Sequence, residues 1–397
     1  MIFKYKAFDR NGNKINAKID ANSIQEAKEK LNDLKIIEIN PTFSFNFSFS
    51  NKVASNKLAR LFSTIGLYLK SNINILTAIK LTLSSQEDKK LIKFLNHLQK
   101  EINEGKSFSS VLKTQKIITL PSFTLSAIQI GEESGKLDEV LLEISKYLKE
   151  QDKIKNKSTQ ALTYPLFIII VSMFMIGFML GVMVPKIVKV FQNLHQDLPP
   201  ITQFVISSGN FVQNNWLTLL FSFIFIIITF NYSYKKFNKF KYIIDNILIH
   251  TPLIKQMILS KELGRFTYFI YILTNSGVNF LSAINLSVNT IDNSVLKNIF
   301  QKAVKEVLEG KKFSTSLNRA GFKYDKSFIQ ALALAEETSE VTTIMKNISD
   351  IYLEENENRI NIFLSLLEPI LIIFVGIIIG IIITALLLPI FSINMIH

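Results

Sequence analysis

Three long segments of this chain are strongly apolar and carry no charged residue, and they limit the fold more than any other feature. They run from Tyr164 to Val184, from Trp216 to about Tyr232, and from Pro369 to Phe391. A helix of roughly 20 apolar residues is long enough to cross a hydrocarbon core of about 30 Å. Aromatic residues at helix ends, as in the second segment, favour the two membrane interfaces. We therefore predict three transmembrane helices, at residues 161–186, 216–234 and 363–391.

The chain also repeats itself at an interval of 204 or 205 residues. The segment Gly131–Gly135, with the sequence GEESG, returns in altered form at Ala335–Glu340. Nine of 24 positions are identical between Leu58–Leu81 and Leu263–Leu286. The apolar segments follow the same interval, as the following pairs illustrate: Tyr164-Pro165 with Glu368-Pro369, and Val184-Pro185 with Leu388-Pro389. The pattern predicts a duplicated module, each copy a soluble segment followed by an apolar one.

The soluble segments have different periodicities. Residues 1–42 predict a small α+β unit, with strands at Phe3–Ala7, Ile15–Ile19 and Ile36–Ile39 and a capped helix at Ile24–Leu34. Residues 56–160 have the 3.6-residue apolar period of amphipathic helices and predict a bundle of about six of them.

The predicted fold class is therefore a mainly α membrane protein with two homologous cytoplasmic helical bundles, three transmembrane helices and a small α+β N-terminal domain. Its predicted parts are the N-terminal domain 1–42, a linker 43–55, the first bundle 56–160, the first span 161–186, an external loop 187–215, the second span 216–234, the second bundle 235–362, the third span 363–391 and an external tail 392–397.

Lysine placement predicts the orientation of these parts. The chain has a net charge of +13, and its lysines cluster before the first span and after the second. Residues 187–215 hold a single lysine, Lys189, and no Lys or Arg follows Phe391. Because basic residues favour the cytoplasmic side, both bundles and the N-terminus are predicted to be cytoplasmic and the C-terminus external. The lysines do not form an aromatic-interleaved stripe, so we expect no direct nucleic-acid binding.

No catalytic, cofactor or metal motif is recognised in the sequence. The four histidines are scattered, and no cysteine is present. The pair Glu132 and Glu133, echoed by Glu336 and Glu337, is the weak candidate for a divalent cation or for docking of a basic partner. The alternative is that these acids favour a helix N-terminus at which Ser134 caps the run beginning at Leu137.

Prolines mark the ends of the apolar segments. Glu368 precedes Pro369, and we expect this pair at a helix start, with the carboxylate near free N–H groups. Pro185 and Pro389 lie near the far ends of the first and third segments and are interpreted as helix stops.

The motifs together resemble one family over nearly the whole chain. They are Phe3-x-Tyr5-x-Ala7-x-Asp9-x-x-Gly12, Gly131-Glu132-x-Ser134-Gly135-x-Leu137, Tyr164-Pro165, Val184-Pro185-Lys186, Leu198-Pro199-x-x-Thr202, and the run from Glu368-Pro369 to Leu388-Pro389-Ile390-Phe391. This order is similar to that of the inner-membrane platform proteins of type II secretion and type IV pilus systems.

The resemblance implies a non-enzymatic, multi-pass protein of the bacterial inner membrane that serves protein secretion, pilus biogenesis or DNA uptake. Its implied partners are a hexameric cytoplasmic assembly ATPase, other inner-membrane assembly components, pilin-like subunits, membrane lipids and further copies of itself. The residues expected to serve structure or docking are Gly131, Glu132, Glu133, Ser134, Gly135, Glu336, Glu337, Pro165, Pro185, Pro199, Glu368, Pro369 and Pro389. The alternative is a membrane transporter with internal repeats, although the apolar segments hold no central ionisable residue.

Overall fold

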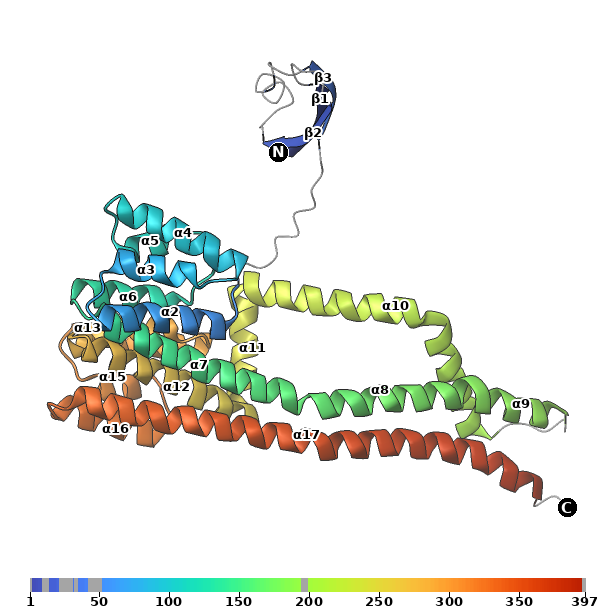
Figure 1. Cartoon of the computed structure of the whole chain (residues 1–397). Coiled ribbons are helices and arrows are strands. Elements are labelled where there is room, and N and C mark those ends of the chain that lie inside the picture. Colours follow the sequence, from blue (N-terminus) through green and yellow to red (C-terminus); the bar gives the residue numbers. More distant parts are fainter. Residues whose placement is uncertain are drawn as a thin grey trace. The chain divides into compact units, whose positions relative to one another are not determined.

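The computed structural model describes residues 2–8, 14–20, 31, 35–41, 52–193 and 199–394. The chain divides into two compact units, Met1–Lys52 and Val53–His397 (Figure 1). The predicted helix at Ile24–Leu34, apart from Leu31, and the predicted linker up to residue 51 lie outside the described residues.

The described residues of the small unit form a three-stranded antiparallel sheet. Its strands are β1 (Ile2–Phe8), β2 (Lys14–Asp20) and β3 (Lys35–Pro41), in the order β2-β1-β3. Tyr5 in the central strand pairs with Ala17 on one side and Ile39 on the other. The three strands agree with the alternating apolar pattern, which is typical of a sheet with one face buried.

The first bundle has six helices, as the apolar periodicity predicts. They are α2 (Ser55–Lys70), α3 (Ile75–Ser84), α4 (Lys89–Asn103), α5 (Phe108–Thr114), α6 (Ser122–Glu133) and α7 (Leu137–Ala161). Local signals set several of their starts. The side chains of Asn74, Asp88 and Ser107 each accept a hydrogen bond from an amide in the first turn of the helix that follows.

The second bundle repeats this order after a connecting helix. Helix α11 (Asn238–His250) leads into the helices α12 (Pro252–Asn275), α13 (Phe280–Ser287), η2 (Val288–Thr290), α14 (Ser294–Leu308), α15 (Phe313–Arg319), α16 (Lys326–Glu337) and α17 (Val341–Asn394). Asn279 caps α13 and Asn293 caps α14, at positions equivalent to Asn74 and Asp88. The repeat is therefore one of capping chemistry as well as of apolar residues.

Among the described residues of the large unit, three helices are long and apolar enough to cross a membrane. The first is formed by α7 with α8 (Thr163–Phe178), the π-helical turn η1 (Met179–Met183) and α9 (Val184–Asn193), which follow one another almost without a break. The second is α10 (Pro200–Lys236), and the third is the outer part of α17. In Figure 1, α8, α10 and α17 extend away from the bundles in roughly the same direction. Much of the segment predicted as an external loop is helical, because α9 reaches Asn193 and α10 begins at Pro200.

Each bundle is built around a close pair of helices, α2 with α7 and α12 with α17. Gly66 allows α2 to approach α7 closely, since a Cβ atom added at Gly66 would lie only 3.1 Å from Leu142 Cγ. In the same way Gly264 allows α12 to approach the backbone of Leu353 in α17. Buried Ser145 donates a hydrogen bond to the carbonyl of Ala59 at 2.7 Å, and its repeat counterpart Ser349 donates to Gly264 at 3.2 Å. The apolar side chains of both bundles form one continuous core.

Candidate functional site

The carboxylate of Glu132 caps the N-terminus of a neighbouring helix. Glu132 lies at the last turn of α6 and accepts hydrogen bonds from the amides of Phe108 at 2.7 Å and Ser109 at 2.9 Å. These are the first two amides of α5, which have no partner within their own helix. A carboxylate at a helix N-terminus also interacts favourably with the helix dipole.

Glu336 does the same in the second bundle. Its carboxylate accepts hydrogen bonds from the amides of Phe313 and Ser314, the second at 3.1 Å, and from the Ser314 hydroxyl. Before each of these short helices stands a glycine with a left-handed backbone, Gly105 at φ 91° and Gly310 at φ 89°, which turns the chain into position. The glycine turn and the acidic pair, separate in the sequence, therefore form one capping device that occurs twice.

The second acid of each pair is exposed at the bundle surface. Glu133 accepts a hydrogen bond from Gln129 Nε2 at 2.7 Å, and Glu337 pairs with Lys312 at 2.9 Å. Within the described residues no group of three or more His, Cys, Asp or Glu side chains could hold a metal ion. Since Glu132 is occupied by two amides, the arrangement supports a structural cap at this position more than a cation site.

The glycines around the acidic pair serve the turn between α6 and α7. Gly135 has φ 71°, and the amide of Lys136 donates to the carbonyl of Gly131 at 2.8 Å, a common helix ending. Ser134 follows the end of α6, whereas α7 begins after Lys136 without a side-chain cap. The expectation that Ser134 caps the following helix is therefore wrong. In the second copy Thr338 is extended, with φ −109° and ψ 157°, so the turn is built differently where serine replaces the glycine.

Pro185 does not end the first span, contrary to our interpretation. It lies in the first turn of α9, directly after the π-helical turn, in which the amide of Val184 bonds to the carbonyl of Met179. Proline has no N–H to donate to the carbonyl four residues earlier and its ring crowds that carbonyl. The wider turn removes this conflict, and the helix continues.

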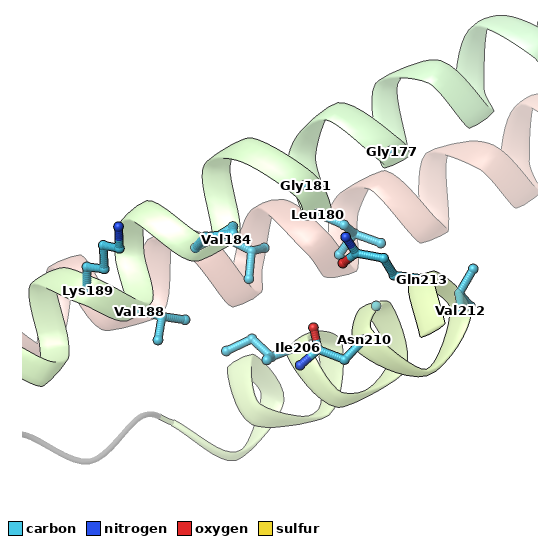
Figure 2. A pocket seen from close by; sticks show the side chains of 12 residues that line it. Gly177, Leu180, Gly181, Val184, Val188, Lys189, Ile206, Asn210, Val212 and Gln213 are labelled. Atoms are coloured by element: carbon cyan, nitrogen blue, oxygen red, sulfur yellow. The ribbon is translucent and has the colours of Figure 1, made fainter. Parts of the chain in front are cut away.

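The outer ends of the spans are held together by the segment around Pro199. Pro199 precedes α10, and Thr202 in its first turn donates a hydrogen bond to the carbonyl of Ala385 in α17 at 2.6 Å. A small apolar cluster of Val184, Val205, Ile382, Ala385 and Leu386 surrounds this bond. Next to it, an open cavity of about 550 Å³ separates α8 and α9 from α10, with Asn210 and Gln213 as polar groups in its lining (Figure 2).

The prolines of the third span also lie inside a helix. Pro369 and Pro389 both fall within α17, so the predicted helix start at Glu368-Pro369 and the predicted stop at Pro389 are wrong. In the first copy Pro165 is the third residue of α8, close to a helix start as its pattern suggests. Tyr164 and Glu368, which occupy equivalent repeat positions, line one shallow cavity of about 400 Å³ between α8 and α17.

The two bundles meet along a seam rich in tyrosine. Tyr268 of α12 stacks on Tyr147 of α7 with ring centroids 5.2 Å apart, and its hydroxyl donates to Glu143 Oε2 at 2.8 Å. Phe269 meets Phe123 edge to face at 4.6 Å. Burial raises the pKa of Tyr147 to about 12, and burial together with the charge of Glu143 raises the pKa of Tyr268 further. No motif in the sequence marked this seam, although small polar residues, Ser63 and Thr64, occupy the equivalent positions in the first copy.

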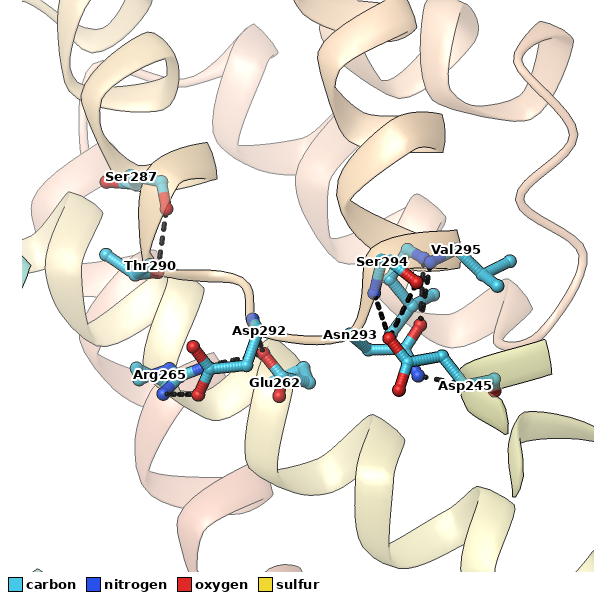
Figure 3. Close-up of polar contacts among 10 residues, drawn as sticks. Asp245, Glu262, Arg265, Ser287, Thr290, Asp292, Asn293, Ser294 and Val295 are labelled. Atoms are coloured by element: carbon cyan, nitrogen blue, oxygen red, sulfur yellow. Dashed lines mark hydrogen bonds and ion pairs between the residues drawn. The ribbon is translucent and has the colours of Figure 1, made fainter. Parts of the chain in front are cut away.

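A polar network ties the connecting helix α11 to the second bundle (Figure 3). Buried Asp245 of α11 accepts hydrogen bonds from the amide of Ser294 at 2.7 Å and its hydroxyl at 2.6 Å, and from the hydroxyl of Tyr234 in α10 at 2.7 Å. Beside it, largely buried Arg265 pairs with Glu262 at 2.6 Å and with Asp292 at 2.7 Å. The end of α10 is therefore fixed to the start of α14 through one carboxylate.

This architecture has a known counterpart. The family described as type II secretion system (T2SS), protein F, matches residues 61–185 and 266–389, and its N-terminal domain matches residues 1–38. The chain belongs to the type II secretion system protein F family. The two matched stretches correspond to the two copies of the module, so the predicted duplication, fold class and family are confirmed.

Curated relatives of the family cover this chain almost completely. Type IV pilus assembly protein PilC of Thermus thermophilus is 24% identical over 99% of this chain and 98% of its own length. Type II secretion system protein F of Pseudomonas aeruginosa is 25% identical over the same shares. Protein transport protein HofC homolog of Haemophilus influenzae is 24% identical over 98% of each. Family membership and the three apolar helices indicate an inner-membrane protein.

Proposed function

We propose that this chain is the non-enzymatic inner-membrane platform of a type II secretion or type IV pilus-like machine. In this role it couples a cytoplasmic hexameric assembly ATPase to the insertion of pilin-like subunits into a filament that serves secretion, pilus growth or DNA uptake. The names of the relatives support the secretion and pilus setting. Other inner-membrane assembly components and further copies of the chain complete the proposed set of partners.

The observation that carries the proposal is the continuity of two helices from the bundles into the spans. Helix α17 runs unbroken from Val341, next to the acidic pair of the second bundle, to Asn394 beyond the apolar segment. The first copy has a similar arrangement from Leu137 to Lys189, interrupted only at Leu162 and by the π-helical turn. A packed helix moves as a rigid element. Because no flexible linker separates bundle and span in these helices, a displacement of either bundle is transmitted to the membrane segment.

The proposed orientation follows the distribution of basic residues. The bundles and the N-terminus lie in the cytoplasm, where they are accessible to an ATPase, and the C-terminus lies outside. A tag that is cleaved by external protease only when fused to the C-terminus supports this orientation, and cleavage of an N-terminal tag contradicts it.

A flexible insertion tests the mechanical coupling. A Gly-Ser-Gly-Ser segment placed after Asn361, between the second bundle and the third span, leaves both folded parts intact and uncouples their movement. We expect loss of filaments with normal protein level and normal pilin processing. The matched control is the same insertion after exposed Ser85, in the loop between α3 and α4, which we expect to be tolerated. Normal filaments from the first variant contradict the proposed coupling.

The exposed acids are the proposed docking points for a basic partner surface. Glu133 and Glu337 are free of the capping role that occupies Glu132 and Glu336. We expect Glu133→Ala with Glu337→Ala to reduce filament assembly at unchanged protein level and unchanged thermal stability. Unchanged assembly in this variant contradicts a docking role of the two acids.

A further inference from the structure

Helix α11 has an apolar face that the bundle does not cover. Asp245 and Ile249 point inward and are buried, whereas Ile243 and Ile247, one helical turn apart, are 55% and 57% exposed. Lys239 and His250 fall on the same outer face, before and after the two isoleucines, and both are exposed. An apolar centre with basic ends is the pattern of a helix that lies in a lipid–water interface.

The position of α11 in the chain agrees with such a location. It begins at Asn238, directly after the membrane-crossing helix α10 ends at Lys236. Figure 1 shows α11 running across the direction of α10, α8 and α17. A helix that starts at the end of a span and runs across it lies along the membrane surface. Four lysines surround this junction, at positions 235, 236, 239 and 241.

A polar cavity opens at the end of α11. Its volume is about 410 Å³, and its lining includes His250, Lys255, Ser260, Tyr324, Tyr352 and Arg359. A second hollow of about 210 Å³ shares Arg359 with it and is lined by Leu253 and Ile362, which are 50% and 47% exposed. Arg359 is the last basic residue before the apolar segment of α17. The cavity is therefore polar and basic at one end and apolar toward the third span.

The carboxylates of the cavity are already engaged, whereas its cations are not. Asp325 accepts hydrogen bonds from the amide of Phe328 at 3.1 Å and from the hydroxyl of Tyr352 at 2.7 Å. Glu355 accepts one from Ser260 at 3.3 Å. Among the described residues, no carboxylate lies within ion-pair distance of half-buried Lys255 or Arg359, and Lys255 Nζ lies 5.5 Å above the ring of Tyr324. A half-buried guanidinium without a partner is costly, and guanidinium and ammonium groups both form strong charge-assisted hydrogen bonds with phosphate.

We propose that α11 lies in the lipid–water interface on the bundle side of the membrane, and that Lys255 and Arg359 bind the phosphate headgroup of an anionic phospholipid. The acyl chains of this lipid run past Leu253 and Ile362 toward the third span. Basic pockets beside membrane helices bind anionic headgroups in this way. The apolar end of the cavity favours a lipid over free phosphate as the source of the phosphate group.

Lipid binding by the full chain tests the pocket. Detergent-solubilised protein is mixed with dioctanoyl phosphatidylglycerol, with dioctanoyl phosphatidylcholine or with inorganic phosphate, and bound molecules are counted by native mass spectrometry. We expect selective binding of phosphatidylglycerol, and roughly tenfold weaker binding in Lys255→Gln with Arg359→Gln, which corresponds to the loss of about 1.4 kcal/mol. The control Arg60→Gln with Lys93→Gln removes the same charges from exposed positions of the first bundle and is expected to bind as the wild type does.

Three results of this experiment would each contradict lipid binding in this pocket. They are equal affinity in the wild type and the Lys255/Arg359 variant, equal affinity for the two lipids, and binding of inorganic phosphate as tight as that of phosphatidylglycerol. Unchanged circular dichroism in both variants separates loss of binding from loss of folding. Arg359→Lys, which keeps the charge, is expected to retain most of the binding.

The location of α11 is tested separately, which is straightforward because the chain has no cysteine. A fluorophore at Ile247→Cys in reconstituted full-length protein is expected to be quenched by lipids that carry bromine near the headgroup. The same label at Lys302→Cys, on exposed α14, is expected to remain unquenched. Equal quenching at both positions, or none at position 247, overturns the interfacial location.

Discussion

Glu132 and Glu336 occupy corresponding positions in two bundles, and each carboxylate accepts hydrogen bonds from the first amides of a short neighbouring helix. The cap joins residues 24 positions apart in the first copy and 23 in the second. Helices α5 and α15 have only seven residues each, too few to be stable by themselves, so they depend on such outside contacts. At the residue scale, the acidic pair is therefore divided into a capping acid and an exposed acid.

Removing the charge of the capping acid should destabilise the first bundle. We expect Glu132→Gln to lower the free energy of unfolding by about 1 kcal/mol, because the amide side chain keeps one acceptor and loses its charge at a helix N-terminus. The measurement is thermal unfolding of the full chain in detergent, followed by circular dichroism. Glu133→Gln is the control and should change stability by less than about 0.5 kcal/mol. An equal loss in the two variants contradicts the division of roles.

Gly131 is required for close packing. A Cβ atom at this position would lie 2.9 Å from Val140 Cγ2 and 3.0 Å from its Cβ. We expect Gly131→Ala to destabilise the first bundle by about 1–3 kcal/mol through overpacking. Adding Val140→Ala removes the contact with Cγ2 and leaves the one with Cβ, so the double variant should recover part of the stability relative to the sum of the two single changes. The free energy of unfolding of all four proteins tests this, and strictly additive losses contradict it.

Local sequence patterns predicted part of this site. The remaining contacts join residues that are far apart in the sequence, and local patterns could not predict them. The repeat interval showed that the acidic pair matters to the module, and the capping residues Asn74 and Asn279 follow ordinary rules. The contact between Glu132 and α5 could not be predicted from spacing within either motif, because two helix ends had to be placed side by side first. A clue was available, since the motifs around Gly105 and Glu132 recur together at nearly the same interval.

At the scale of elements, helices continue where proline predicts an end. Both Pro185 and Pro389, the two predicted helix stops, lie inside helices. In water the lost hydrogen bond of a proline is replaced by solvent, but in an apolar environment leaving the helix would expose many more backbone groups. A widened turn at Met179–Met183 is therefore more favourable than a helix end. Three candidate spans were predicted, and the described residues hold three helices that are long and apolar enough, because length and composition alone decide this property.

Replacing Pro185 should change the register of α9. In Pro185→Ala the amide is restored, the π-helical turn can close to a regular α-helix, and the residues beyond it rotate by about 100°. We expect a cysteine pair at Val188 and Ile206, which line the cavity in Figure 2 from α9 and α10, to be bridged by a short bifunctional thiol reagent in the parent and less in the variant. The control pair, Leu180 and Gly209, lies at the start of the turn and should cross-link in both. Unchanged cross-linking at both sites contradicts a role of Pro185 in the wide turn.

At the scale of the whole molecule, the seam between the copies is asymmetric. The first copy contributes α6 and α7, whereas the second contributes its central helix α12, through Tyr268 and Phe269. A two-fold symmetric pair would place equivalent surfaces opposite each other. Here α12 is buried against both bundles, while Leu67 of α2, equivalent to buried Ile272, is 54% exposed.

The seam should be sensitive to alkaline pH. Burial raises the pKa of Tyr147 to about 12, whereas an unfolded tyrosine has a pKa near 10. The folded state therefore holds this proton longer, and its stability falls as the pH rises from about 10 to 12. For one tyrosine the free energy of unfolding falls by at most about 2.7 kcal/mol over this pH range. Tyr147→Phe keeps the stacked ring and removes the titration, so its stability should fall less than that of the wild type between pH 8 and pH 11. Equal losses contradict the assignment.

The asymmetric seam has a consequence for the history of the chain. Once the two halves of a duplicated gene meet through different surfaces, each half is selected for a different set of neighbours. Tyr268 and Phe269 make the contacts of the seam from the second half, whereas Ser63 and Thr64 occupy the equivalent positions in the first. We therefore expect the two halves not to be interchangeable. A chimera with two first halves should keep the helices of each bundle and lose the contact that makes them one body.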